Sequence, residues 1–211
     1  MESYHVISGL KIKGTEIVSL ANGSSIFEKQ GTVDGACGPY SLFMALKILG
    51  ELSQEDVNKP EKIKKSRSAF KFMNEINKFK GLFFAGTDIT EIYNLINNNF
   101  KTKLAIDYSQ EDDNSDVINF ILEQLDDNKP TIVRISFPKG SHWLVAIGYS
   151  KNEKNKNFNL LLLDPSGDKP SVSPWNSIIE IGSKRKGDFP NHWHTNGYNI
   201  IFDEALSICS K

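Results

Sequence analysis

The stretch Gln30-Gly-Thr-Val-Asp-Gly-Ala-Cys37-Gly-Pro-Tyr-Ser-Leu-Phe-Met-Ala-Leu-Lys-Ile-Leu49 decides how the rest of this sequence is interpreted. It starts with small residues and continues as an apolar run at helical spacing, which predicts a buried helix over residues 39–49. Cys37 then lies at the helix N-terminus, where unpaired backbone N–H groups and the helix dipole favour a thiolate. A buried cysteine is often only a small apolar side chain. The flanking glycines, which let the backbone approach a ligand closely, favour a nucleophile here.

The composition is that of an ordinary globular protein. The chain has 211 residues, of which 39% are hydrophobic and 24% charged, so we expect one domain over residues 1–211 with a core from 28 to 203. A net charge of −1 disfavours a nucleic-acid partner. No apolar run is long enough to span a bilayer, and the N-terminus lacks the pattern of a Sec signal. We therefore expect a cytoplasmic protein, or one exported by a dedicated non-Sec system.

Hydrophobic periodicity changes from helical to strand-like along the chain. The predicted helices after the first are Ser66–Lys80, one that starts at the capping box of Asp88 and Glu91, and one that carries Val117 to Leu125. The predicted strands are Lys103–Tyr108, Thr131–Phe137, His142–Tyr149, Phe158–Leu163 and Tyr198–Phe202. Residues 4–20 are expected to form a short hairpin or an extended arm. This order predicts an α+β fold, with N-terminal helices packed on a C-terminal antiparallel sheet.

Two of the predicted strands bring a histidine and a carboxylate together. His142 begins one strand, and Asp164 directly follows the next. If these strands pair as a hairpin, the start of the first lies beside the end of the second, so the carboxylate can orient the imidazole. The other ring nitrogen would then face the Cys37 thiol. The alternatives are a buried or surface histidine and an aspartate that only forms the turn before Pro165.

The order of cysteine, histidine and aspartate resembles the papain-like cysteine proteases. The closer resemblance is to the bacterial group that includes the double-glycine leader peptidases of bacteriocin exporters. The matching stretches are Gln30 to Leu49, Gly86-Thr87, Ser141 to Gly148 and Leu163 to Gly167. The resemblance implies a papain-like fold, a protein or peptide substrate, Cys37 as nucleophile, His142 as general base and acid, and Asp164 as the group that orients the histidine.

The resemblance also implies a glutamine in the oxyanion hole, for which Gln30 is the candidate. The family pattern places this glutamine six positions before the cysteine, whereas here the separation is seven, and Gly31 occupies the sixth position. Either the loop carries one extra residue or the oxyanion hole is built differently. No transporter segment and no phosphate-binding Gly-x-x-x-x-Gly-Lys-Ser/Thr motif accompany the pattern, so we expect a free-standing domain.

The sequence predicts a cysteine hydrolase that cleaves a peptide or isopeptide bond through a thioester, with a role as a bacterial effector or toxin. Glutamine deamidation and acyl transfer use the same three residues and remain alternatives. A non-catalytic binding module on the same scaffold is a further one. Neither a cofactor nor a metal is expected, although His192 and His194 leave a zinc protein as the least favoured alternative. We expect residues 188–196 to form a loop near the rim of the cleft, and Trp175 either to pack at that rim or to cover the pair of His142 and Asp164.

Overall fold

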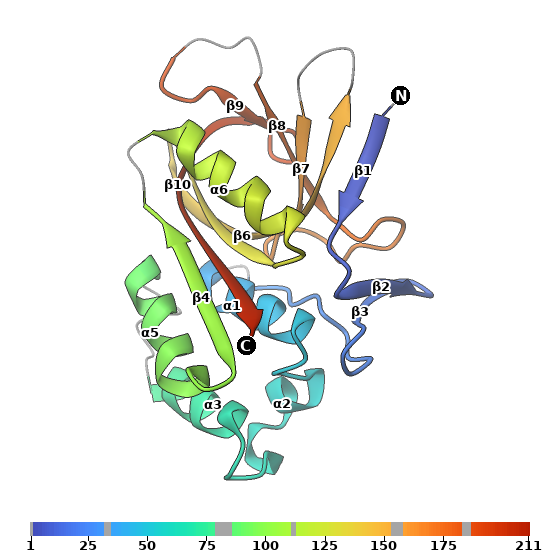
Figure 1. The fold of residues 1–211 in the computed structure, drawn as a ribbon, viewed down its shortest axis with the longest axis vertical. Helices are drawn as coiled ribbons and strands as arrows, with labels where there is room; N and C mark the ends of the chain where they lie inside the picture. Colours follow the sequence, from blue (N-terminus) through green and yellow to red (C-terminus); the bar gives the residue numbers. More distant parts are fainter. Residues whose placement is uncertain (1, 32–34, 79–85, 111–112, 153–157, 183–186) are drawn as a thin grey trace.

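A computed structural model of the 211-residue chain describes residues 2–31, 35–78, 86–110, 113–152, 158–182 and 187–211. Its helices and strands follow one another along the chain as shown in Figure 1. They are β1 (Glu2–Val6), β2 (Leu10–Lys13), β3 (Glu16–Ser19), α1 (Cys37–Ile48), α2 (Gln54–Asn58), the 3-10 helix η1 (Pro60–Lys62), α3 (Ser68–Lys78), α5 (Ile89–Phe100), β4 (Leu104–Ser109), α6 (Asn114–Asp126), β5 (Thr131–Phe137), β6 (Gly140–Asn152), β7 (Phe158–Leu163), β8 (Ser177–Ile181), β9 (Asn191–Trp193) and β10 (Tyr198–Ser210).

The predicted α+β fold is confirmed, and the antiparallel sheet closes on itself. β6 pairs with both β5 and β7, and the path from β5 through β10, β9 and β8 returns to β7. Six antiparallel strands therefore form a barrel, to which β1 adds at β6 and β4 adds at β10. β2 and β3 form the separate N-terminal hairpin. Closure removes the exposed edges that an open sheet of these strands would present.

Two predictions in the last third of the chain are corrected. The strand predicted to end at Phe202 continues as β10 to Ser210, because the register shift between Phe202 and Glu204 lets the strand carry polar residues at a bulge. Residues 188–196, predicted as a loop, contain β9. A three-residue strand gives too short a pattern to be found by periodicity. β8, which alternates buried and half-buried residues, was not predicted although its pattern is that of a strand.

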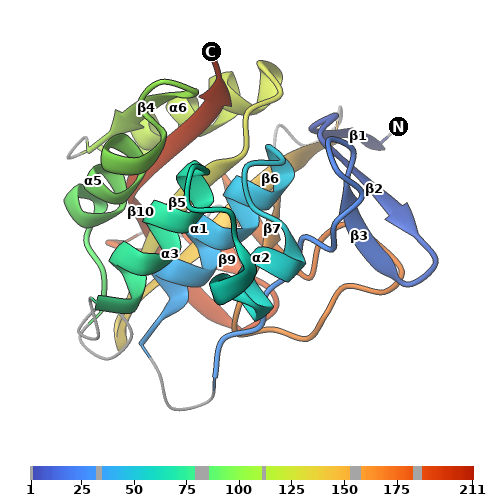
Figure 2. The ribbon, with the colours of Figure 1, turned by 90° about the horizontal axis from the view of Figure 1, so that it is seen from below.

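Helix α1 is the central helix of the molecule. All its residues except Cys37 and Tyr40 are buried, including the polar Ser41 and Lys47, as expected for a helix that is mostly apolar all round. It lies between the barrel strands β5 and β6 on one side and the other helices on the other, as Figure 2 shows from below. The capping box predicted at Asp88 is present and starts α5. The predicted helix 66–80 is α3, whose last two predicted residues lie outside the described part of the chain.

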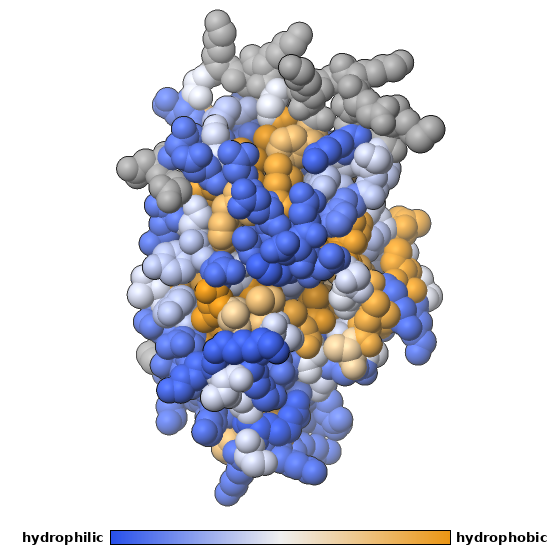
Figure 3. Space-filling view, viewed as in Figure 1, coloured by the Kyte–Doolittle hydropathy of each residue, from blue (hydrophilic) through white to orange (hydrophobic). Residues whose placement is uncertain are grey.

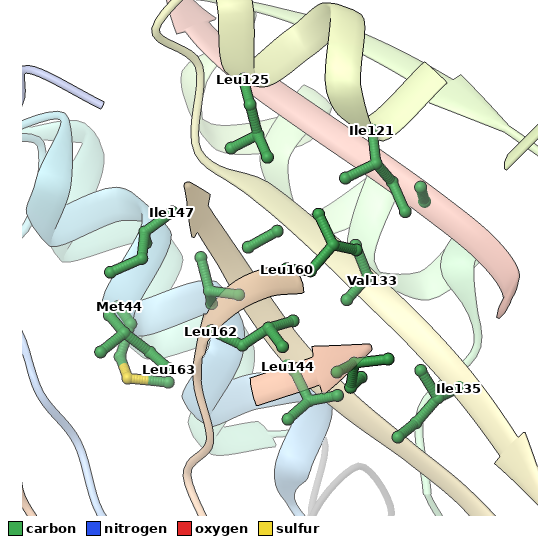
Figure 4. Close-up of a cluster of buried hydrophobic side chains, with 14 of the residues drawn as sticks. Met44, Ile121, Leu125, Val133, Ile135, Leu144, Ile147, Leu160, Leu162 and Leu163 are labelled. Atoms are coloured by element: carbon green, nitrogen blue, oxygen red, sulfur yellow. The ribbon is translucent and has the colours of Figure 1, made fainter. Parts of the chain in front are cut away.

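Two clusters of buried apolar side chains join the helices to the sheet. One fills the barrel and the space beneath α6 and α1, and it includes Met44, Ile121, Leu144 and Leu162, which are spread across the view in Figure 4. The other lies between α1, α3, α5 and the outer face of the barrel. The face drawn in Figure 3 is largely hydrophilic, but apolar side chains gather toward its centre as well as at the edge formed by β2 and β3, where Ile12 is exposed.

Candidate active site

Cys37 is the first residue of α1, two positions before the predicted helix start. The residue before it, Ala36, offers no side chain to cap the helix, so the first backbone N–H groups of α1 are not bonded by a capping side chain. Cys37 is half-buried and not in a disulfide. The next position requires a glycine, because a Cβ at Gly38 would lie 2.8 Å from the Cβ of Thr87. The glycine therefore lets the cysteine end of α1 approach the loop that precedes α5.

The hairpin of β6 and β7 brings His142 and Asp164 together, as the sequence pattern predicted. Val145 pairs with Leu163, so the residue after β7 lies opposite the start of β6. His142 Nε2 and Asp164 Oδ1 are 2.8 Å apart, and both side chains are buried. Since Nε2 is engaged, Nδ1 is the ring nitrogen that remains for the hydrogen bond between His142 and Cys37. The structure thus places Cys37, His142 and Asp164 in one continuous chain of contacts.

Cys37 and His142 perturb each other's ionisation, and Asp164 adds to the shift at His142. Burial raises the pKa of the Cys37 thiol, but the hydrogen bond and charge of His142 outweigh it, together with hydrogen bonds from the backbone of Trp143 and Gly38. The pKa of Cys37 is therefore below its ordinary value. Burial lowers the pKa of His142, but Asp164 and Cys37 more than reverse this and raise it to about 9. These opposite shifts favour a thiolate beside an imidazolium at neutral pH.

The turn at residues 164–167 and the side chain of Asn176 hold Asp164 in place. The Asn176 side chain accepts a hydrogen bond from the Asp164 N–H at 2.7 Å and donates one to the Asp164 carbonyl at 2.8 Å. The N–H of Ser166 donates to Asp164 Oδ1 at 2.8 Å, and the Ser166 hydroxyl lies 3.4 Å from His142 Nε2. Asn176 was not among the predicted site residues, because a side chain that bonds to backbone leaves no motif in the sequence.

The aromatic ring of Trp193 covers one face of the His142 imidazole. Trp193, on β9, stacks on the imidazole with ring centroids 5.6 Å apart and planes 20° apart, and its Nε1 donates to Ser177 Oγ at 2.7 Å. Sequence reasoning had suggested Trp175 for this place. Trp175 instead stacks on Tyr4. Trp193 was missed because the residues around it had been predicted to form a loop.

Cys37 and His142 line a cleft of about 760 Å³ between the helices and the barrel. Gln30 lines the same cleft, so the seven-residue separation from Cys37 does not remove it from the site. Gly86 and Thr87 form part of the wall, and Trp143 Nε1 donates to the Thr87 carbonyl at 2.8 Å. Arg134 from β5 and the first turn of α5, with Asp88 and Glu91, complete a polar lining that sequence reasoning had not assigned to the site.

The two histidines that suggested zinc lie elsewhere, on and just after β9. His192 Nδ1 is bonded to Asn199 Oδ1 at 3.1 Å, and His194 faces Glu180 at 3.4 Å. Within the part of the chain that the structure describes, no three side chains of histidine, cysteine, aspartate or glutamate converge as metal ligands. The cleft itself offers a thiol, an imidazole and an amide, which are the groups that nucleophilic acyl chemistry uses.

A model of the Peptidase_C39 like family matches residues 24–199. The chain belongs to this family. The match spans the cysteine helix, both hairpin strands and the Asp164 turn, and it places the chain among the papain-like cysteine proteases, as the sequence motifs had predicted. Family membership implies a cysteine peptidase with a peptide substrate.

Other comparisons add little. Among the solved structures that match is the crystal structure of UfSP from C. elegans, with 15% sequence identity and a TM-score of 0.48. That match covers 99% of this chain, which spans 34% of the UfSP chain. No curated protein matches the sequence. None of the helices in the described ranges is long and apolar enough to cross a membrane.

Proposed function

We propose that this protein is a cysteine hydrolase that cleaves a peptide or isopeptide bond through a thioester on Cys37. The observation that carries the proposal is the buried hydrogen bond between His142 Nε2 and Asp164 Oδ1 behind a half-buried cysteine at a helix N-terminus. Such an arrangement activates a thiol, holds one imidazole tautomer and keeps a proton ready for a leaving group.

Each residue has a distinct role in the proposed reaction. The Cys37 thiolate attacks the carbonyl carbon, and the electron pair of the C=O bond moves to the oxygen. The backbone N–H of Cys37 and the side-chain amide of Gln30 stabilise that oxyanion. When the tetrahedral intermediate collapses, the C–N bond breaks and His142 gives its proton to the departing amine. His142 then takes a proton from water as the water attacks the thioester. The Cys37 thiolate is released and pairs again with the protonated His142.

Asp164 acts through His142. Its carboxylate holds the imidazole with Nδ1 toward the sulfur and stabilises the imidazolium that exists before the amine leaves. Trp193 and the 164–167 turn cover the histidine and the carboxylate, so little water competes for their hydrogen bond. Low solvent access strengthens the electrostatic coupling between the two groups.

The same residues serve deamidation and acyl transfer, and the three reactions differ only in the leaving group and acceptor. Purified protein would be incubated with a mixture of N-acetylated peptides that contain glutamine and lysine residues. The masses of the products would then be measured by mass spectrometry. Hydrolysis cleaves a peptide and adds the mass of water across the two fragments. Deamidation leaves the peptide intact with a gain of about one mass unit, and acyl transfer joins an acyl group to an amine. Cys37→Ala is the control for every product.

We expect cleavage in the wild type, a Cys37 acyl adduct in rapidly quenched samples and neither in Cys37→Ala. Product formation that persists in Cys37→Ala would contradict the proposal. Labelling of Cys37 at the rate of an ordinary thiol, together with no product from any peptide, would favour the non-catalytic alternative. The effector role, and cytoplasmic location or export by a dedicated system, stay predictions of the sequence.

A further inference from the structure

Gln30, the proposed oxyanion donor, is not fixed by hydrogen bonds to its own amide oxygen. Within the described residues its buried Oε1 accepts no hydrogen bond. A buried acceptor without a partner is unfavourable, so something else must keep the side chain in the cleft. Two contacts of segment 28–30 do this, because one joins the segment to the Asp164 turn and the other joins it to α1.

On one side, the backbone of Gln30 is joined to the Asp164 turn. The Gln30 N–H donates to the Pro165 carbonyl at 2.9 Å. Lys29 forms an ion pair with Asp168 in the same turn at 2.8 Å, although both side chains are largely exposed. The segment that carries Gln30 therefore follows the position of the turn that orients His142.

On the other side, Glu28 is joined to the cysteine helix by a buried lysine. Lys47 is on α1 and fully buried, and its Nζ contacts Glu28 Oε1. Gln54 closes a ring of three side chains, because its Oε1 accepts from Lys47 at 2.7 Å and its Nε2 donates to Glu28 at 2.9 Å. Burial lowers the pKa of Lys47, whereas Glu28 opposes that shift and favours the charged form.

The reach of the lysine explains how this contact bears on the cleft. Lys47 lies ten positions after Cys37, which is about 15 Å along a helix axis. Side chains of a helix lean toward its N-terminus, so the long lysine returns along α1 in the direction of Cys37. Glu28 meets it there, two residues before Gln30. A charged pair with its polar groups bonded inside a protein has a strongly preferred geometry.

We propose that the buried pair of Glu28 and Lys47 is a positioning device that holds Gln30 in register with Cys37. The segment that carries Gln30 is joined to α1 through Glu28 and to the Asp164 turn through the Gln30 N–H. Lys47 and Glu28 touch no reacting atom and act through Gln30. This inference rests on the proposed role of Gln30 in the oxyanion hole.

The test separates the oxyanion hole from the thiolate. N-acetyl-Gly-Gly aldehyde is the probe, since its carbonyl adds the Cys37 thiol to give a hemithioacetal oxygen at the oxyanion position, and glycine side chains demand nothing of the cleft. The measured quantity is the aldehyde concentration that half-protects Cys37 from iodoacetamide. Alkylation by iodoacetamide needs the thiolate but no oxyanion donor, so its uninhibited rate reports the Cys37–His142 pair alone.

The variants are Lys47→Met, the charge-free pair Glu28→Gln/Lys47→Met, Gln30→Ala and their combinations. Arg67→Met is the matched control, because it removes an ion pair with Asp56 at 2.6 Å in the helical half, and Asp56 and Arg67 are not in the cleft lining. If the buried charge of Glu28 prevents Lys47→Met from folding, the charge-free pair carries the comparison.

We expect Lys47→Met and the charge-free pair to weaken protection about tenfold, because a small displacement of a catalytic group is costly, with the uninhibited alkylation rate unchanged. On a Gln30→Ala background the same substitutions should have no further effect, since residues that act through one another are not additive. Arg67→Met should protect as the wild type does.

Two kinds of result would overturn the inference. They differ in whether the proposed oxyanion role of Gln30 stands. If Gln30→Ala weakens protection while the Lys47 variants do not, or if their losses add, the positioning role is wrong and the proposed oxyanion role stands. If Gln30→Ala protects as well as the wild type, or the wild type is not protected, Gln30 is not the donor and both ideas fail.

Discussion

Asn176 brackets the backbone of Asp164 on both sides, with its Oδ1 accepting from the Asp164 N–H at 2.7 Å and its Nδ2 donating to the Asp164 carbonyl at 2.8 Å. Asp164 can therefore present its carboxylate to His142 only as long as the asparagine is in place. Gly167 belongs to the same arrangement, since a Cβ there would lie 2.8 Å from Asn176 Nδ2. The geometry of the site is thus determined partly by residues that no substrate would touch.

Asn176→Ala should reduce both stability and activity. The substitution leaves the N–H of the buried Asp164 without its partner and removes one of the two hydrogen bonds to the Asp164 carbonyl, which costs about 1–3 kcal/mol in the free energy of unfolding. With Asp164 less well held, the pKa of His142 should fall and kcat/KM with it. Urea unfolding and the pH profile of peptide cleavage check the two effects.

Asn22→Ala is the matched control for that substitution. Asn22 also bonds to backbone in a turn, at the Gly50 carbonyl and the Ser24 N–H, but outside the cleft. It should lose stability without a change in the pH profile. An Asn176→Ala protein whose profile coincides with the wild type would show that the bracket serves stability alone.

Peptide cleavage should follow a bell-shaped pH profile. Lowering the pH through the depressed pKa of Cys37 protonates the nucleophile, so kcat/KM falls. Raising the pH through the His142 pKa of about 9 removes the proton meant for the leaving amine, so kcat/KM falls again. The two limbs report the coupled pair rather than separate residues. A descending limb near pH 6.5, the ordinary value for histidine, would contradict the coupling.

Asp164→Asn tests the charge of the orienting group while leaving its shape nearly unchanged. Asp164 provides the largest of the contributions that raise the pKa of His142, so its neutralisation should move the descending limb toward lower pH. Impaired general acid catalysis predicts a loss of about 10²–10⁴ in kcat/KM. Asp127→Asn, which alters an exposed aspartate paired with Lys129 at 3.1 Å and absent from the cleft lining, is the control and should retain activity.

The sequence motifs were sufficient to predict the three central residues because each lies at the end of a regular element. Cys37 begins a helix, His142 lies near the start of a hairpin and Asp164 directly follows it. The strand register of that hairpin then brings His142 and Asp164 together. Trp193, Asn176 and Arg134 could not be predicted in the same way. Trp193 reaches the site through the closure of the barrel, which depends on the pairing of β5 with the distant β10, and no local periodicity encodes that pairing. Arg134 lies on β5 opposite Trp143 and Asn176 directly precedes β8, but neither belongs to a motif that marks it as a site residue.

The fold shows the same division between local and distant information. The apolar run of α1 and the capping box of α5 were predicted because their signals are local. The extension of β10 past its bulge was not, because Asp203 and Glu204 interrupt the apolar pattern. In the structure these two carboxylates are near Arg134, at 4.0 and 3.2 Å from its guanidinium.

Gly38→Ala should damage the cleft more than the fold. The added Cβ would meet the Thr87 side chain at 2.8 Å and Trp143 at 3.3 Å, so the loop before α5 must move. Overpacking of this kind costs about 1–3 kcal/mol. Gly9→Ala, whose Cβ would meet only Ile48 at 3.0 Å and 3.6 Å at the far end of α1, is the control. We expect a larger loss of kcat/KM in Gly38→Ala than in Gly9→Ala at matched unfolding free energy.

The rate at which iodoacetamide labels each cysteine near pH 6, followed by peptide mass spectrometry, tests the account most directly. An ordinary thiol with a pKa of about 8.5 is almost fully protonated there and reacts slowly. The thiolate–imidazolium pair predicts that Cys37 labels much faster than Cys209, and that His142→Ala removes the difference. Equally slow labelling of both cysteines in the folded wild type would contradict the activated thiol on which the proposed function depends.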